Sequence, residues 1–209
     1  MTFEQLKDAI TDWLGKDHNQ ITDTVRGQLV NMAQRRILRN YDLRFGEHTA
    51  AQDTANADPD YDVPAGYSRT YSIWYKSGTE YYDLISLTKE EFDKMFGDNS
   101  ATSNPTHYCI WENQLFLGPC PDATYSLNWQ CYRMLPDLAD GSPNNENDMT
   151  DAVWEYLLFK ALALATKYLI EDARGAVWAE EADRLEADIV REHAREKSVH
   201  RRPTTNEPG

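Results

Sequence analysis

Residues 153–170 are the most hydrophobic stretch of the chain, and they constrain its fold more than any other segment. At helical spacing, apolar side chains occupy two faces of this stretch: Val153, Leu157, Ala161, Leu164 and Tyr168 on one, and Trp154, Leu158, Leu162, Ala165 and Leu169 on the other. Glu155, Lys160 and Lys167 interrupt it, and each charge near a bilayer centre costs roughly 2.5–3.5 kcal/mol. We therefore predict a helix buried in protein, covered by the N-terminal helices, a sheet or neighbouring subunits.

The N-terminal part has the pattern of a helical hairpin. Apolar residues recur at helical spacing over residues 3–14, and Gly15 follows as a stop signal. The same period returns over residues 21–41, where either Thr22 or Asp23 is available as the N-cap. The start of the chain lacks the basic flank and apolar run of a signal peptide, so no export is expected.

The C-terminal part is predicted to hold a second long helix, over about residues 172–197. Its apolar side chains form one narrow stripe on a charged surface: Trp178, Ala182, Leu185 and Ile189. Most of its circumference is therefore expected to be exposed. Residues 198–209 contain almost no apolar side chains and are expected to be a flexible tail on their own.

The middle of the chain changes to β-type patterns. Residues 47–60 are poor in large apolar side chains and are predicted to be a loop. Aromatic and β-branched residues follow, and they predict antiparallel strands at residues 69–76 and 79–86, joined by a tight turn at Ser77 and Gly78.

Further elements complete this region. Thr88 precedes Glu91 by three residues, which is the spacing of a capping box, and predicts a short helix to about Phe96. Two more strands are expected to turn at residues 112–114, and a third to follow a turn at residues 119–122. Together these strands predict a small, mostly antiparallel sheet.

The predicted fold class is α+β, with a helical bundle formed by the N- and C-terminal helices and an inserted small antiparallel β-rich domain. The expected boundaries are residues 1–46 for the helical hairpin, 47–149 for the β-rich insertion, 150–197 for the helices that complete the bundle, and 198–209 for the tail.

Charge and cysteine content exclude some classes of function. The 209 residues carry a formal charge of −14, and residues 47–149 hold 17 acidic and 5 basic side chains. A surface this acidic is poorly suited to gripping nucleic acid, because affinity for phosphates comes mainly from Lys and Arg. Three cysteines cannot all pair within one chain, which favours a reducing compartment over a disulfide framework.

No residue pattern points to catalysis or to a cofactor. The sequence has no nucleotide-binding glycine loop, no nucleophile elbow and no HExxH or CxxC spacing. Cys109, Cys120 and Cys131 could form a soft metal site with His107, but isolated thiols in strands are more often simply packed. We therefore predict no catalytic, cofactor-binding or metal-binding residue.

Two further patterns have a functional and a structural interpretation. Carboxylate pairs such as Glu80 with Asp83, or Glu90 with Asp93, could serve a glycosidase, although an acidic solvated face is the simpler interpretation. An aromatic strip could bind a sugar or a base, but hairpin packing is favoured for its residues: Tyr67, Tyr71, Trp74, Tyr75, Tyr81 and Tyr82.

The order of motifs resembles the head-to-tail adaptor (connector, or head-completion) proteins of tailed bacteriophages. The first motifs are an NxAQRRI stretch, a YxxPxGY entry to the β-rich insertion and an LTxEEF helix: Asn31, Ala33 to Ile37; Tyr61, Pro64, Gly66, Tyr67; and Leu87 to Phe92. The later motifs are a strand run and a closing helix pair: Pro105, Tyr108, Ile110, Leu115, Leu117, Pro119, Pro121, Asp122, Tyr125, Leu127, Tyr132, Leu135, Pro136 and Leu138; then Leu157, Leu158, Ala161 to Ala163, Ala165, Tyr168, Leu169, Asp172, Ala176 and Trp178. The resemblance spans about residues 2–195.

The resemblance implies a structural virion protein, made in the host cytoplasm and placed at the head–tail junction. It implies a homo-oligomeric ring, usually of twelve copies, that joins the portal protein to a tail nozzle or tail-tube protein. Double-stranded DNA would pass through the ring without specific binding, and no membrane is involved. We expect portal binding by the tail residues His200, Arg201, Arg202 and Pro203, and contacts between subunits through a set of helical residues: Trp154, Leu158, Leu162, Trp178 and Leu185.

Two alternatives remain at this point. The first is an adaptor with an accessory peptidoglycan hydrolase activity that depends on one glutamate. The second is a protein-binding module unrelated to phage particles. A peptidoglycan clearing assay addresses the first, and a mass measurement in solution addresses the second.

Overall fold

The structure is a computed structural model that describes residues 1–15, 21–141 and 143–200, with side chains to residue 197. The chain divides into two compact units. The helical unit consists of residues 1–45 and 135–209, and the β-rich unit of residues 46–134. The α+β class, with antiparallel sheets between N- and C-terminal helices, is confirmed.

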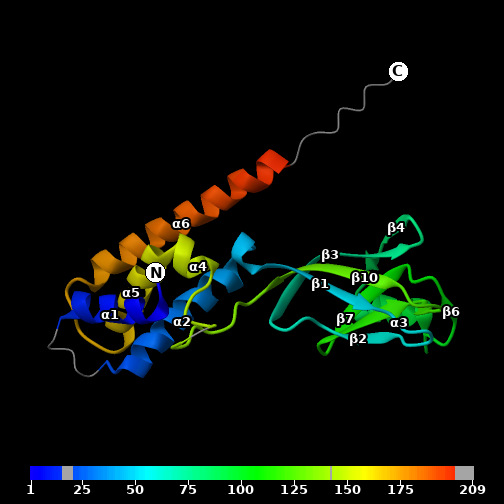
Figure 1. The fold of residues 1–209 in the computed structure, drawn as a ribbon, viewed down its shortest axis with the longest axis horizontal. Coiled ribbons are helices and arrows are strands. Elements are labelled where there is room, and N and C mark those ends of the chain that lie inside the picture. The colour runs from blue at the N-terminus through cyan, green and yellow to red at the C-terminus, as the bar shows by residue number, and fades with distance from the viewer. Residues whose placement is uncertain (16–20, 142, 201–209) are drawn as a thin grey trace, which may run out of the picture. The chain divides into compact units, whose positions relative to one another are not determined.

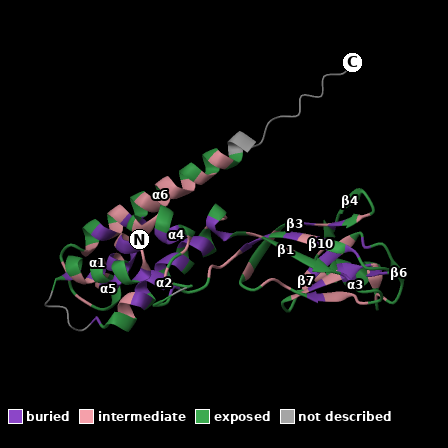
Figure 2. Cartoon of the chain, in the orientation of Figure 1, coloured by how far each residue is buried: buried purple, intermediate pink, exposed green. Residues whose placement is uncertain are grey.

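The helical unit is built around α5 (Trp154–Tyr168). This helix contacts α1 (Phe3–Leu14), α2 (Asp23–Asn40), α4 (Asp148–Ala152) and α6 (Gly175–His200), as Figure 1 shows. The sequence left open whether the N-terminal helices, a sheet or neighbouring subunits bury this helix. Within the described residues, helices of the same chain make its main contacts. In Figure 2 the buried residues concentrate on α2 and α5, whereas α6 is largely intermediate or exposed.

Local capping explains where these helices begin. The backbone N–H of Gln5 donates to Thr2 Oγ1 at 3.1 Å, and the backbone N–H of Thr2 donates to Gln5 Oε1 at 2.9 Å, which completes a capping box. At α2, the cap is Thr22, whose hydroxyl accepts from the backbone N–H of Val25. The helix expected from Thr150 onward is interrupted at Val153, which has φ −135° and ψ 32° and separates α4 from α5.

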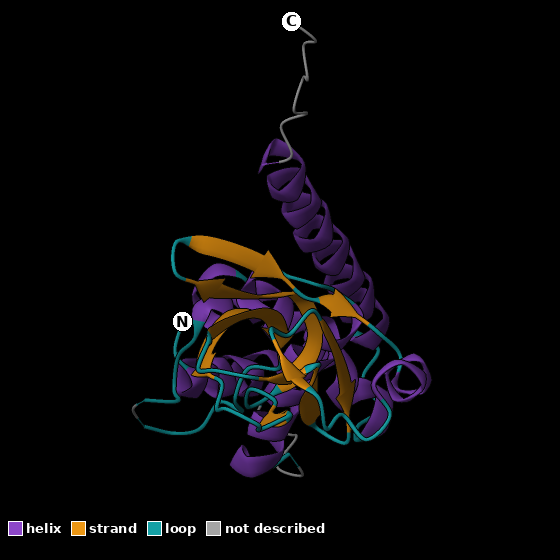
Figure 3. Cartoon of the chain, turned by 90° about the vertical axis from the view of Figure 1, so that its right-hand side faces the viewer, coloured by secondary structure: helices purple, strands orange, loops and turns teal. Residues whose placement is uncertain are grey.

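The β-rich unit contains two four-stranded sheets and a two-stranded parallel pair. One sheet has the order β1-β10-β3-β4, with strands Glu47–Asp53, Ser126–Arg133, Tyr67–Ser77 and Glu80–Asp83. The other has the order β2-β8-β7-β5, with strands Asp60–Asp62, Gln114–Gly118, His107–Trp111 and Ile85–Ser86. The pair is β6 (Thr102–Ser103) with β9 (Cys120–Pro121), and α3 spans Lys89–Phe96. Figure 3 shows these strands arranged around a common interior.

Two expectations about the strands are wrong. Residues 47–60 are not a loop throughout: β1 pairs with β10 from Glu47↔Tyr132 to Asp53↔Ser126, and β2 pairs with β8, so only residues 54–59 lie outside strands. The small, polar side chains of β1 bury little apolar surface and would not order this segment by themselves. Its order comes from the backbone hydrogen bonds to β10. The expected strand at residues 79–86 ends at Asp83, since Ile85 and Ser86 pair in parallel with β7 of the other sheet.

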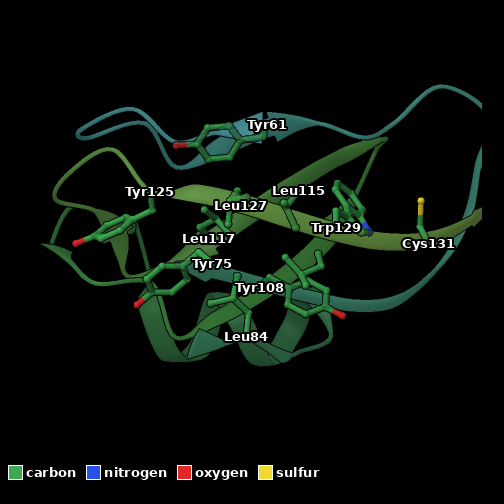
Figure 4. Close-up of a cluster of buried hydrophobic side chains, with 11 residues drawn as sticks. Tyr61, Tyr75, Leu84, Tyr108, Leu115, Leu117, Tyr125, Leu127, Trp129 and Cys131 are labelled. Carbon is green, nitrogen blue, oxygen red and sulfur yellow. The ribbon is translucent and has the colours of Figure 1, made fainter. Parts of the chain in front are cut away.

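The interior of the β-rich unit is an aromatic and aliphatic cluster supplied by both sheets (Figure 4). Its members come from β2, β3, β7, β8 and β10, together with Leu84 and Tyr125. In Figure 4, Tyr61 and Tyr108 lie on opposite sides of the aliphatic side chains Leu115, Leu117 and Leu127. Interdigitation of side chains from two sheets is the packing expected of facing sheets.

Candidate functional site

The segment after β10 belongs to the helical unit, although the sequence placed the β-rich insertion up to residue 149. Asn31 and Gln34 of α2 are buried and bind its backbone: Asn31 Nδ2 donates to the Leu138 carbonyl at 3.0 Å, and Gln34 Nε2 donates to the Pro136 carbonyl at 3.0 Å. Asn147 Nδ2 donates to Gln34 Oε1 at 2.7 Å. Asn31 and Gln34 of the NxAQRRI motif therefore hold residues 135–141 and 143–147, which we call the return segment, against α2.

A buried lysine joins the same segment to the hairpin. Lys7 is 5% exposed, and its ammonium group lies 2.6 Å from a carboxylate oxygen of Asp23 and 2.6 Å from one of Asp140. The hydrogen bond from Lys7 holds the pKa of the Asp23 carboxyl below its usual value. This ion-pair cluster fixes α1, the start of α2 and the return segment together.

A second buried lysine fixes α6 on α5. Lys160 is 7% exposed, and its ammonium group donates to Asp183 and to Glu186, each at 3.0 Å. The hydroxyl of Tyr156 also donates to Glu186, at 3.3 Å. Burial, followed by the charge of Glu186, raises the pKa of Tyr156 far above its usual value.

The residues expected to contact other subunits differ in how far they are buried within the chain. Leu158, Leu162 and Trp178 are 3%, 0% and 3% exposed, so their side chains are already buried by packing within the chain. Trp154 and Leu185 are only partly buried. Of the predicted set, these two are the ones that a second copy could reach.

The expected portal-binding residues lie at or beyond the end of the described chain. The backbone of His200 is the last residue of α6, and its side chain is outside the described part. Arg201, Arg202 and Pro203 lie outside the described residues altogether.

An apolar surface at one end of the helical unit was not singled out from the sequence. Four large side chains are exposed there, around the ends of α1 and α5 and the start of α6: Trp13 at 45%, Tyr168 at 61%, Leu169 at 47% and Val177 at 64%. The guanidinium of Arg174 organises this end by donating to the carbonyls of Trp13 and Leu14 and by stacking over the ring of Trp178. Exposed apolar groups in such a concentration mark a surface suited to protein contacts.

The aromatic strip divides between core and surface. Tyr75 is 1% exposed and belongs to the core cluster, and Tyr67 packs against that cluster. Tyr71, Tyr81 and Tyr82 are 72%, 65% and 37% exposed. Tyr81 contacts Trp74 edge-on, with ring centroids 5.2 Å apart, so the outer part of the β3–β4 hairpin carries paired aromatic rings.

The carboxylate pairs considered for a glycosidase are surface groups. Glu80 and Asp83 lie on the exposed strand β4, and Glu80 accepts a hydrogen bond from Tyr82. On α3, the lysines one turn away neutralise the other pair: Lys94 binds Glu90 and Lys89 binds Asp93. These are i,i+4 helix pairs, whose usual role is local stabilisation.

The three cysteines are buried and free, and burial raises the pKa of each thiol: Cys109, Cys120 and Cys131. Across residues 1–15, 21–141 and 143–200, no group of three or more His, Cys, Asp or Glu side chains is arranged to hold a metal ion. In the same part of the chain, no helix is both long and apolar enough to cross a membrane.

Both units carry exposed apolar, aromatic or charged side chains, which are suited to contacts with other proteins. In the comparison with protein families, the model of the SU10 adaptor protein family matches residues 1–206. The chain belongs to this family of phage adaptor proteins. No curated protein gives a significant match to the chain.

Proposed function

We propose that this adaptor protein forms a closed ring that joins the portal protein to a tail nozzle or tail-tube protein at the head–tail junction of the virion. The observation that supports the proposal most directly is the family match over residues 1–206. Adaptor function requires surfaces for at least two kinds of neighbour, and the chain has an apolar end on its helical unit and an acidic β-rich unit.

The charge of the chain suits a position around passing DNA. With a formal charge of −14, the protein repels phosphates instead of binding them, so a duplex can move through the ring without sticking. We propose that DNA contacts the ring without specific recognition. The role proposed is structural, without catalysis and without a cofactor.

We propose that Trp154 and Leu185 take part in contacts between subunits, because their side chains are partly exposed on α5 and α6. The residues His200, Arg201 and Arg202, followed by Pro203, remain our proposed portal-binding segment. Such polar termini commonly become ordered on their partner.

Cryo-electron microscopy of the chain mixed with the portal protein of the same phage tests this proposal. We expect a ring of copies, twelve in number, seated on the portal and open along its axis. A particle that lacks this protein but retains its packaged DNA and joins tails normally would refute the proposed role. If the purified chain clears peptidoglycan and one Glu→Gln change abolishes the clearing, the protein is catalytic and the proposed purely structural role is wrong.

A further inference from the structure

The β-rich unit has an apolar groove between the outer strands of its two sheets. The groove lies between β1 and the end of β2, and its volume is about 240 Å³. Its lining includes four core side chains: Ile73, Leu115, Leu127 and Trp129. Because β1 and β2 are each at the edge of their sheet, neither has a sheet partner on its outer side within the described residues.

Carboxylates lie along the strands that flank this groove. Asp53 and Asp62 are exposed at the ends of β1 and β2, and Asp58 and Asp60 are partly exposed between them. Asp53 accepts a hydrogen bond from Ser126, and Asp60 accepts one from Gln114, but both donors are neutral. Within the described chain, no ion pair involves these four carboxylates. Of the four, Asp62 lines the groove itself, and Asp53 directly follows the lining residue Gln52. The groove therefore combines an apolar floor with unneutralised carboxylates in and beside its lining, which we call its acidic rim.

The helical unit carries the complementary surface on α2. Met32 is 43% exposed, and Arg36 and Arg39 follow it at i+4 and i+7, so the three side chains share one helical face. Neither arginine forms an ion pair with another described residue. Arg35, at the border of this face, is engaged by Asp137 at 3.5 Å. We call Met32, Arg36 and Arg39 the basic face of α2.

We propose that the basic face of α2 in one copy docks on the β1–β2 groove of the next copy. Met32 contacts the apolar floor, and Arg36 and Arg39 pair with the carboxylates of the rim, in the manner of a helix with i, i+4 and i+7 anchors. Charge complementarity supports this choice of occupant, since residues 46–134 hold 13 acidic and 5 basic side chains.

The proposed contact joins two different surfaces, so every copy keeps one of each available for a further neighbour. A heterologous contact of this kind produces a ring when its rotation closes. The inference thus rests on the ring assembly proposed above, and it identifies which surfaces make the contact.

Paired charge reversals test this contact with the full-length chain. One variant combines Arg36→Glu and Arg39→Glu, and the other combines Asp53→Lys and Asp62→Lys; all four side chains are exposed. Each variant alone has like charges on both surfaces and is expected to lose assembly, with a dissociation constant raised roughly tenfold or more. An equimolar mixture restores opposite charges at every contact, so the mixture is expected to assemble. The association of the wild type should weaken at high salt.

Sedimentation velocity, with and without the portal protein, gives the masses, and circular dichroism checks that each variant is folded. If the wild type and both variants form the same oligomer, the proposed function stands and this contact is wrong. If both variants lose assembly and the mixture does not recover it, the two surfaces are not partners. If the wild type forms no oligomer even with the portal protein, the proposed function itself fails.

Discussion

Asn31 binds the backbone of Leu138 in both directions. Its Nδ2 donates to the Leu138 carbonyl at 3.0 Å, and its Oδ1 accepts from the Leu138 N–H at 2.8 Å. Both hydrogen bonds are buried, and they join positions 107 residues apart in sequence. A single side chain therefore replaces the strand partner that this stretch of backbone lacks.

Replacing Asn31 with Leu should lower the free energy of unfolding by roughly 2–4 kcal/mol, because two buried backbone groups lose their partners. Gln28→Ala is the matched control, since Gln28 is an exposed polar residue of the same helix and should change stability by less than about 0.5 kcal/mol. Urea denaturation followed by circular dichroism measures both. Equal effects of the two substitutions would mean that the Asn31 hydrogen bonds do not stabilise the fold.

Gly66 occupies a backbone position that an L-residue fills poorly. Its φ is +74°, and a Cβ added there would lie 2.7 Å from the carbonyl oxygen of Met134, whose N–H donates to the Gly66 carbonyl. We expect Gly66→Ala to destabilise the β-rich unit by more than about 2 kcal/mol, because it combines backbone strain with a clash.

Gly78→Ala is the control for this prediction. Gly78 also has a positive φ, +61°, but nothing lies within 4 Å of an added Cβ. Its cost should therefore be the conformational part alone, about 1–2 kcal/mol. Thermal unfolding of the two variants compares them directly, and a Gly66 variant no less stable than the Gly78 variant would exclude the proposed clash.

The sequence predicted the elements whose signals are local. The capping box at Thr88 and the turn at Gly78 each depend on neighbouring residues, and both are present. The strand β1 was missed because its small, polar side chains are mostly exposed, and its order comes from pairing with β10. Local patterns do not contain such long-range pairing.

The candidate surfaces were less predictable for the same reason. Leu158 and Leu162 were expected between subunits, but their apolar character is used inside the chain, and periodicity does not distinguish these two kinds of burial. Gln52 and Asp62 line a common groove because β1 and β2 pair with strands more than fifty residues away. No motif spacing indicates that relationship.

The two carboxylates that bind Lys160 should differ in energetic weight. Both accept from its ammonium group at 3.0 Å, but the Glu186 side chain is 14% exposed and the Asp183 side chain is 73% exposed. Glu186→Gln should therefore destabilise the fold by roughly 1–3 kcal/mol, because it removes the buried countercharge of Lys160. Asp183→Asn, the same chemical change at an exposed site, should cost less than about 1 kcal/mol. Chemical denaturation of both variants decides, and a larger effect at Asp183 would contradict this assignment.

Tyr125 should make the stability of the β-rich unit depend on pH in the alkaline range. Its hydroxyl donates to Asp122 Oδ1 at 2.6 Å, and its oxygen also lies 2.8 Å from Asn104 Oδ1. The hydrogen bond to the Asp122 carboxylate, followed by burial, raises the pKa of Tyr125 to about 12. In the unfolded chain the phenol has its usual pKa of about 10.

Because the folded chain holds this proton more tightly, the stabilisation is fully present below pH 10 and is lost as the pH rises towards 12. Above that range the phenolate would face the carboxylate of Asp122. Tyr125→Phe removes the titrating group, so the difference in unfolding free energy between wild type and variant should be constant up to about pH 9 and shrink above pH 10. Urea denaturation across this pH series measures the difference. Tyr71→Phe, at a side chain that is 72% exposed, is the control and should leave the pH dependence of the wild type unchanged. A difference that stays constant up to pH 11 would show that Asp122 does not hold the Tyr125 proton.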